Sequence, residues 1–168
     1  NAYVIYEDKS GILWIGTKGG LSRFDPISQT FTSYSINAWD PNSLISSSIY
    51  SLWEDRQGVM WIGTTNGLIK FDPNEGTFFS YTENEGLPND VINGILEDHN
   101  GNLWLSTNRG LSRFNSDTEA KEKRFKNYDV RDGLQGNEFN GGASFKAEDG
   151  EMFFGGTNGF NSFYPDRI

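Results

Sequence analysis

The sequence predicts an all-β fold of about four β-propeller blades, each a four-stranded antiparallel meander. The first observation is a repeated segment, found as Glu7–Thr17, Glu54–Thr64 and Glu97–Thr107. Each copy begins with Glu-Asp, has a glycine three residues after the Asp and a tryptophan three residues after that glycine. The copies recur at intervals of roughly 40–50 residues, which is typical of propeller arrays. The second observation is that each repeat contains four short apolar runs separated by turn residues, as a blade requires.

The first run of each repeat precedes the Glu-Asp pair, at Tyr3–Tyr6, Ile49–Trp53 and Val91–Leu96. We expect it to be a strand that ends in a tight turn. The short Asp carboxylate can accept hydrogen bonds from the backbone N–H groups of that turn. Repetition at one position in every blade therefore favours a structural role for these carboxylates over a catalytic one.

The second run contains consecutive apolar residues, as in Leu13–Ile15, which indicates a strand that is buried on both faces. Blades pack face to face, so the aromatic residue of this run is expected in the core between blades. These expected core residues are Trp14, Trp61, Trp104 and, in a weaker fourth copy, Phe153. Sugar stacking by the tryptophans is the less favoured interpretation.

The third run follows a short turn, and its copies are Gly20–Phe24, Gly67–Phe71, Gly110–Phe114 and Gly159–Phe163. Asn-Gly precedes or opens two of these copies and suits a type I′ hairpin turn. The fourth run carries an aromatic pair three residues apart, in Phe31–Tyr34, Phe78–Tyr81 and Phe125–Tyr128. The fourth repeat has no such run after Tyr164.

We expect one domain with blades at about 1–35, 47–82, 90–129 and 139–168, the last incomplete. The chain is expected to be a C-terminal slice of a larger propeller, because a complete one would have more blades. An open arc leaves its two end faces bare, and bare apolar faces attract partners. The hypothesis is self-association through the terminal blades, with Trp14, Phe153, Phe154 and Phe160 facing water in the monomer. The alternative is a small closed ring.

Composition excludes several partners. The formal net charge of −9 argues against nucleic acid and against direct contact with an anionic membrane, because both require a basic surface. Cysteine is absent, so disulfides and thiolate metal sites are excluded. The sequence contains no apolar run long enough to span a membrane and no signal peptide; any targeting segment is expected upstream.

With these motifs the chain resembles the two-component regulator propeller repeat family. The connections Glu85–Asn89 and Asp132–Gly142 are similar to inter-blade links of that family, and Phe154–Asp166 is similar to its last blade. The resemblance implies the periplasmic sensor region of a hybrid two-component sensor histidine kinase of the Bacteroidetes type. It further implies signal transduction by carbohydrate sensing, with a glycan or its breakdown product as ligand.

No catalytic residues, metal site or cofactor are expected. Glycoside hydrolysis needs two carboxylates about 5–10 Å apart that face one pocket. Carboxylates on separate hairpin turns are not expected to meet this requirement. The single histidine, His99, occupies a turn position held by Lys9 and Arg56 in other repeats, so it is expected to be exposed. Two alternatives to a sensor stay open: a propeller enzyme such as a lyase or glycosidase, and a dimerisation scaffold whose ligand site lies in absent blades.

The loops that do not repeat are the better candidates for ligand binding, because loops on a rigid scaffold concentrate binding residues. Trp39 offers an aromatic face for a sugar ring, and Arg109 and Arg131 could pair with a uronate carboxylate or a sulfate. The full set of candidate ligand-binding residues is Trp39, Asn66, Asn108, Arg109, Arg131 and Asn137. The alternatives to ligand binding are that Trp39 packs within its loop and that the arginines are solvated surface charges.

Overall fold

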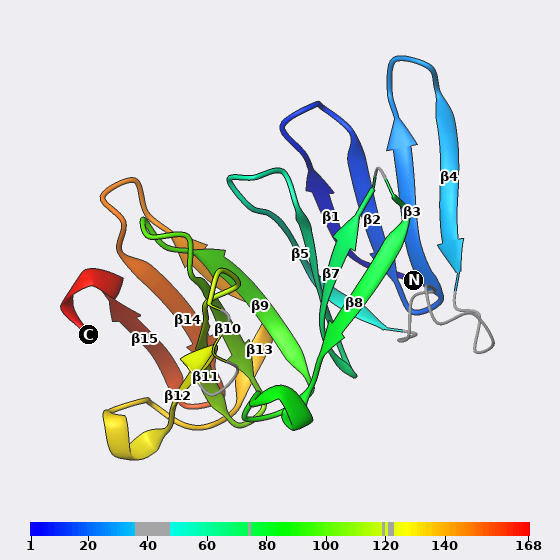
Figure 1. Cartoon of the computed structure of the whole chain (residues 1–168). Coiled ribbons are helices and arrows are strands. Elements are labelled where there is room, and N and C mark those ends of the chain that lie inside the picture. The colour runs from blue at the N-terminus through cyan, green and yellow to red at the C-terminus, as the bar shows by residue number, and fades with distance from the viewer. Residues whose placement is uncertain (36–47, 74, 119, 121–122) are drawn as a thin grey trace.

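The computed structural model describes residues 1–35, 48–73, 75–118, 120 and 123–168. The described chain forms four antiparallel sheets, each with its strands in chain order (Figure 1). The predicted all-β fold with four blades is confirmed, including a last blade of three strands.

The first blade contains β1 (Ala2–Glu7), β2 (Leu13–Thr17), β3 (Gly20–Asp25) and β4 (Thr30–Ser35). The second contains β5 (Ile49–Glu54), β6 (Met60–Thr64), β7 (Gly67–Asp72) and β8 (Thr77–Tyr81). The third contains β9 (Ile92–Glu97), β10 (Leu103–Thr107), β11 (Gly110–Phe114) and β12 (Phe125–Tyr128). The fourth contains β13 (Phe139–Lys146), β14 (Met152–Gly156) and β15 (Gly159–Phe163).

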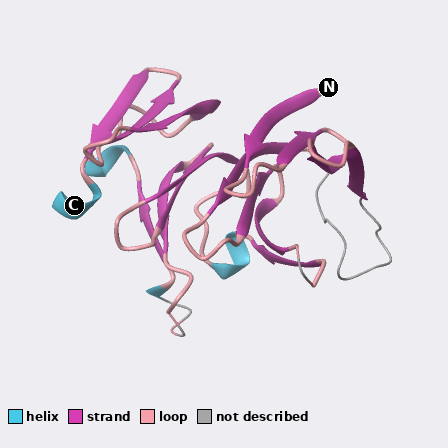
Figure 2. Cartoon of the chain, turned by 90° about the horizontal axis from the view of Figure 1, so that it is seen from above, coloured by secondary structure: helices cyan, strands magenta, loops and turns pink. Residues whose placement is uncertain are grey.

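Short 3₁₀ helices join some of these strands: η1 (Glu83–Glu85) lies between the second and third blades, η3 (Val130–Asp132) between the third and fourth, and η4 (Pro165–Arg167) follows β15. The innermost strands β1, β5, β9 and β13 contact one another in that order. Seen from above, the blades form a curved row, with the N- and C-terminal blades at opposite ends (Figure 2). The monomer is therefore an open arc.

The core lies between blades, and one tryptophan centres each interface. Trp14, Trp61 and Trp104 are 2%, 1% and 1% exposed. Each faces the next blade along the chain, where it meets the ring of Phe71, Phe114 or Phe163 at 5.7, 5.3 or 4.8 Å between centroids. The consecutive apolar residues of the second strands arise because both faces of an inner blade are covered.

Each tryptophan is also fixed by the Asp of its own turn. The indole Nε1 of Trp14, Trp61 and Trp104 donates to the Oδ2 of Asp8, Asp55 and Asp98 at 2.8, 2.7 and 3.0 Å. The Oδ1 of the same Asp accepts from two backbone amides of the turn, for example those of Gln57 and Val59, both at 2.9 Å. The Asp of the repeat thus closes the hairpin and orients the buried indole at once.

The terminal faces differ from the sequence expectation. Trp14 is buried against the second blade and Phe154 is buried against the third, so neither meets water. Phe153, expected in the core, is half-buried on the outer face of the fourth blade, close to the exposed Phe145 and Phe160. The reason is that a residue at the tryptophan position faces the following blade, and the described chain has none there.

Candidate functional site

All four innermost strands carry a β-bulge at the same level. The ladder shifts between Ala2 and Val4 in β1, and between Ile49 and Ser51 in β5. It shifts in β9 between Ile92 and Gly94, and in β13 between Phe139 and Ser144. The extra residues are Tyr3, Tyr50 and Asn93, and residues 140–143 in β13. A bulge bends its strand and turns the extra side chain away from the ladder.

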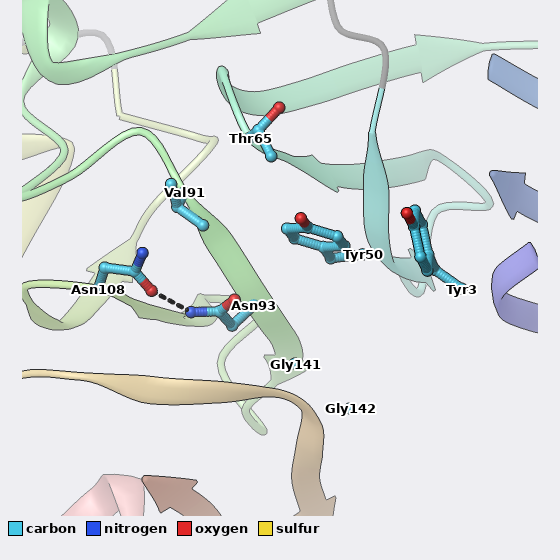
Figure 3. A pocket seen from close by; sticks show the side chains of 8 residues that line it. All are labelled: Tyr3, Tyr50, Thr65, Val91, Asn93, Asn108, Gly141 and Gly142. Atoms are coloured by element: carbon cyan, nitrogen blue, oxygen red, sulfur yellow. Dashed lines mark hydrogen bonds between the residues drawn. The ribbon is translucent and has the colours of Figure 1, made fainter. Parts of the chain in front are cut away.

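These bulged residues meet around the axis of the arc and line a cavity of about 520 Å³ (Figure 3). Side chains or backbone from all four blades contribute, so the cavity depends on the arrangement of the blades rather than on one sheet. Its lining residues are Tyr3, Tyr50, Thr65, Val91, Asn93, Asn108, Gly141 and Gly142. We call this cavity the axial pocket. Its volume is in the range of small-molecule sites.

One wall of the axial pocket is aromatic. The rings of Tyr3 and Tyr50 lie edge to face, with centroids 5.5 Å apart and planes at 68°. Tyr3 is 47% exposed, so its ring is accessible from the pocket side. Tyrosine combines an apolar ring with a polar hydroxyl, which suits a ligand that has both C–H faces and hydroxyl groups.

The opposite wall is formed by amides. Asn93, which is 5% exposed, donates from Nδ2 to Asn108 Oδ1 at 2.9 Å and to the backbone oxygen of Phe139 at 2.8 Å. These bonds fix the Asn93 amide and connect the third blade to the fourth. The Asn108 side chain lies at the exposed rim of the pocket, on the turn between β10 and β11.

On the fourth blade, the axial pocket is bounded by Gly141 and Gly142, and there is free space next to both residues. A Cβ atom added at Gly141 or Gly142 would meet no atom within 4 Å. Gly142 has a φ of 72°, a left-handed conformation that favours glycine, whereas Gly141 has no such constraint. The missing side chains at these positions contribute directly to the free volume of the pocket.

No residue that lines the axial pocket is charged. A ligand there would be recognised by hydrogen bonds and apolar contact rather than by ion pairing. The lining also offers neither a carboxylate pair nor an imidazole, the groups that general acid–base hydrolysis uses.

Of the predicted ligand residues that the structure describes, Asn108 alone lines the axial pocket. Asn66 and Arg109 are exposed on the neighbouring turns but do not line it. Asn137 is exposed, and its backbone oxygen accepts from the Gly110 amide at 2.7 Å. Trp39 lies outside the described residues.

Arg131 is held on η3 rather than directed at the pocket. Its Nη2 donates to Asp129 Oδ2 at 2.6 Å, and its Nε donates to the same carboxylate. This contact lowers the pKa of Asp129 and raises the pKa of Arg131. The guanidinium is thus already paired with a carboxylate of its own helix cap.

Sequence reasoning missed Tyr3, Tyr50 and Asn93. These residues stand four positions before the Glu of each repeat and were assigned to the apolar first run. This position is Tyr, Tyr and Asn in the three full repeats and Gly142 in the fourth, but the next position varies at least as much, as Val4, Ser51, Gly94 and Ala143. Variation between repeats alone therefore does not single out the residues that line the pocket.

The Glu-Asp pairs and His99 lie in turns, where they contact the backbone and the neighbouring blade. Among the described residues no group of three or more His, Cys, Asp or Glu side chains could hold a metal ion. His99 is exposed, and its Nε2 is 2.6 Å from the position that a Cβ on Gly150 would take, so its ring lies against the fourth blade.

No helix among the described residues has the length and apolarity of a membrane span.

Comparison with protein-family models matches residues 1–19, 43–66 and 86–109 to the two-component regulator propeller. No curated protein sequence matches the chain. Among solved structures, the extracellular domain of BT3049 from B. thetaiotaomicron, described as a hybrid two-component system, is 31% identical with a TM-score of 0.83. That match covers 99% of this chain and 22% of the other.

A second extracellular domain from the same organism, that of BT4673, is 26% identical with a TM-score of 0.77, over 98% of this chain and 23% of that one. Virginiamycin B lyase from Staphylococcus aureus is 15% identical with a TM-score of 0.64, over 96% of this chain and 55% of the enzyme, and that likeness concerns the fold alone. The chain thus spans less than a quarter of the two-component structures that it matches.

Proposed function

Because this chain belongs to the two-component regulator propeller repeat family, we propose that it is a ligand-sensing module of the extracytoplasmic part of a hybrid two-component sensor kinase. The two similar structures from B. thetaiotaomicron are extracellular domains of such systems, at 31% and 26% identity. In this proposal the chain resides in the periplasm and the kinase that it serves is anchored in the inner membrane. The chain itself carries no catalytic function.

The proposed ligand is an uncharged glycan or its breakdown product, bound in the axial pocket. The observation that carries this proposal is the composition of the lining: two tyrosine rings on one side, two asparagine amides on the other, and no charge. Apolar rings suit the C–H faces of a sugar, and amides can both donate to and accept from its hydroxyl groups. The net charge of −9 further disfavours polyanionic glycans.

The experiment is thermal unfolding of the chain with a panel of neutral and acidic oligosaccharides. A neutral oligosaccharide at about 100 times its Kd should stabilise the fold by about 2.7 kcal/mol. For a chain of this size that raises Tm by roughly 5–10 °C. Uronate oligosaccharides should give no shift.

Gly141→Leu tests the location of the site. Its side chain would extend into the open floor of the pocket, where nothing lies within 4 Å of the new Cβ. Gly19→Leu is the matched control, because Gly19 is an exposed turn glycine outside the pocket whose added Cβ would make only an ordinary contact with Thr17. Gly141→Leu should abolish the ligand-induced shift in Tm, and Gly19→Leu should retain it. Equal shifts in both variants would place the ligand elsewhere.

A further inference from the structure

The two side-chain amides of the axial pocket have a fixed polarity. Asn93 Nδ2 lies 2.8 Å from the backbone oxygen of Phe139, and a carbonyl oxygen can only accept, so the nitrogen of Asn93 must face it. The second N–H of this nitrogen donates to Asn108 Oδ1 at 2.9 Å (Figure 3). One backbone carbonyl thus determines the orientation of both amides, because Asn108 must turn its oxygen toward Asn93.

This arrangement leaves one acceptor and one donor for a ligand. Among the described residues nothing donates to Asn93 Oδ1, and nothing accepts from Asn108 Nδ2. Both residues line the axial pocket, and Asn93 is only 5% exposed. A polar atom on so buried a side chain gains more from a bound partner than an atom at the open surface does, because water reaches it less readily.

Apolar groups adjoin this donor–acceptor pair. Val91, two residues before Asn93, lines the same pocket and is half-buried. The Tyr50 ring and then the Tyr3 ring lie beyond it, on the other side of the pocket (Figure 3). A ligand group that fits this wall must therefore carry a donor, an acceptor and a small apolar part side by side.

A secondary amide carries these three features at once. The bonded atoms lie in the middle of the asparagine pair, so the free donor and the free acceptor lie at its two ends. The C=O and N–H of a trans amide likewise lie at opposite ends, and their polarity is as fixed as that of the asparagines. A hydroxyl group rotates to suit either partner, so it gains nothing from fixed polarity. On a sugar, the secondary amide is an acetamido group.

We propose that the axial pocket recognises an N-acetylated sugar. The acetamido N–H donates to Asn93 Oδ1, its C=O accepts from Asn108 Nδ2, and its methyl group lies against Val91. This inference rests on the proposed function and adds the chemical class of the ligand to it. Asn108 is then a specificity-determining residue, because its Nδ2 donor selects the acetamido carbonyl, while Phe139 holds Asn93 in the orientation that accepts the N–H.

The probes are two disaccharides that differ in this group alone: di-N-acetylchitobiose carries acetamido groups where cellobiose carries hydroxyl groups. Isothermal titration calorimetry should give a Kd for di-N-acetylchitobiose that is at least about tenfold lower than the Kd for cellobiose, which corresponds to about 1.4 kcal/mol. Saturation-transfer NMR should show the acetyl methyl as the most strongly saturated group of the bound sugar, because it contacts Val91 inside the pocket.

Asn108→Asp tests the polarity of the pair directly. The new carboxylate still accepts from Asn93, but it presents an acceptor where the amide presented a donor. Di-N-acetylchitobiose should bind this variant about tenfold more weakly, because its C=O then faces a carboxylate oxygen. Cellobiose should keep its affinity, because a hydroxyl can turn to donate, and that result also shows that the variant is folded. Asn66→Asp, which adds the same charge on an exposed turn outside the pocket, should leave both affinities unchanged.

The outcomes separate this inference from the proposed function. Equal affinities for the two disaccharides, both lost in Gly141→Leu, would overturn the inference and leave the proposed function standing. Unchanged binding of di-N-acetylchitobiose to Asn108→Asp would also overturn it, because the acetamido group would then lie elsewhere. If no neutral oligosaccharide binds at all, the proposed function itself is contradicted, and this inference with it.

Discussion

At the scale of the residue, one carboxylate in each repeated turn accepts hydrogen bonds both from the turn and from the buried tryptophan. Asp98 is 2% exposed and accepts from the amides of Asn100 and Asn102, from the Asn102 side chain and from the Trp104 indole. Burial alone would raise the pKa of Asp98, but these hydrogen bonds outweigh burial and hold the pKa below its ordinary value. The ionised form is therefore the form that the fold stabilises.

This predicts a specific loss of stability in acid. Because the folded-state pKa of Asp98 is lowered, its contribution is complete above the unfolded pKa of about 3.9 and is lost as pH falls through the folded pKa. Asp98→Asn places an NH₂ group near donors and should cost roughly 1–3 kcal/mol at pH 7. Unfolding of both proteins in urea between pH 7 and pH 2.5 checks this prediction.

The difference in stability between wild type and Asp98→Asn should shrink as the pH falls below about 4. Taking the difference separates Asp98 from Asp25, Asp129 and Asp149, whose pKa values are also lowered. Glu148→Gln, which changes an exposed carboxylate in the turn between β13 and β14, serves as the control. A difference that is constant over the pH range would mean that Asp98 acts through shape alone.

At the scale of the element, each turn between the first and second strands reaches forward to the next blade. Lys9 donates from its backbone amide to Glu54 Oε2 at 2.7 Å. Arg56 lies 3.6 Å from Glu97 Oε1 and donates to the backbone oxygens of His99 and Asp98 at 2.5 and 2.8 Å. The Glu of the repeat is thus an acceptor for the preceding blade, while the Asp serves its own blade.

Arg56→Lys should weaken the contact between the second and third blades. The guanidinium reaches two carbonyl groups at once, whereas an ammonium group cannot reproduce that planar fork. We expect a loss of about 1 kcal/mol, because the side chain is partly exposed and solvent screens the ion pair. Arg109→Lys, the same change on an exposed turn at the opposite rim, should leave the urea midpoint unchanged. Equal midpoints for wild type and Arg56→Lys would show that the fork adds no stability.

The repeats made the blades predictable, because hairpin turns and apolar runs are local properties of the chain. Three features were not predictable in this way. The bulges at Tyr3 and Tyr50 depend on register between strands, which alternation of residues does not reveal. The half-buried state of Phe153 depends on whether another blade follows, and the accessible cavity depends on how four blades curve around one axis. Loop variability pointed to Asn108 but not to the strand residues beside it.

At the scale of the whole molecule, the open arc leaves two apolar faces in water. The first blade exposes Ile5 at 66% and Phe31 at 67%, and the fourth exposes Phe145 at 64% and Phe160 at 65%. Every internal interface joins the tryptophan face of one blade to the opposite face of the next. The bare faces at the two ends are therefore of complementary kinds, and a contact between two copies would be head to tail.

We accordingly expect self-association of this chain through its terminal blades. Burial of a few hundred Å² of apolar surface at about 25 cal/mol per Å² amounts to several kcal/mol and offsets part of the association entropy. Light scattering at increasing micromolar concentrations should give masses that rise above 18.9 kDa. The double variant Phe145→Ser with Phe160→Ser should shift this rise to higher concentration, and exposed Phe79→Ser is the control. A mass of 18.9 kDa at every concentration would argue against the contact.

The bulges of the inner strands also separate two tasks, lining the axis and holding the blade together. Within each of the three complete repeats, one side chain turns to the axis while the neighbouring side chains hold the blade together. Exchanging Tyr3 or Tyr50 would therefore alter what the axis accepts without changing the sheet that carries it, whereas Asn93 also links the third blade to the fourth. In a propeller of this kind, the chemistry of the axis can change through one position per repeat, while the Asp–Trp pairs keep the blades in place.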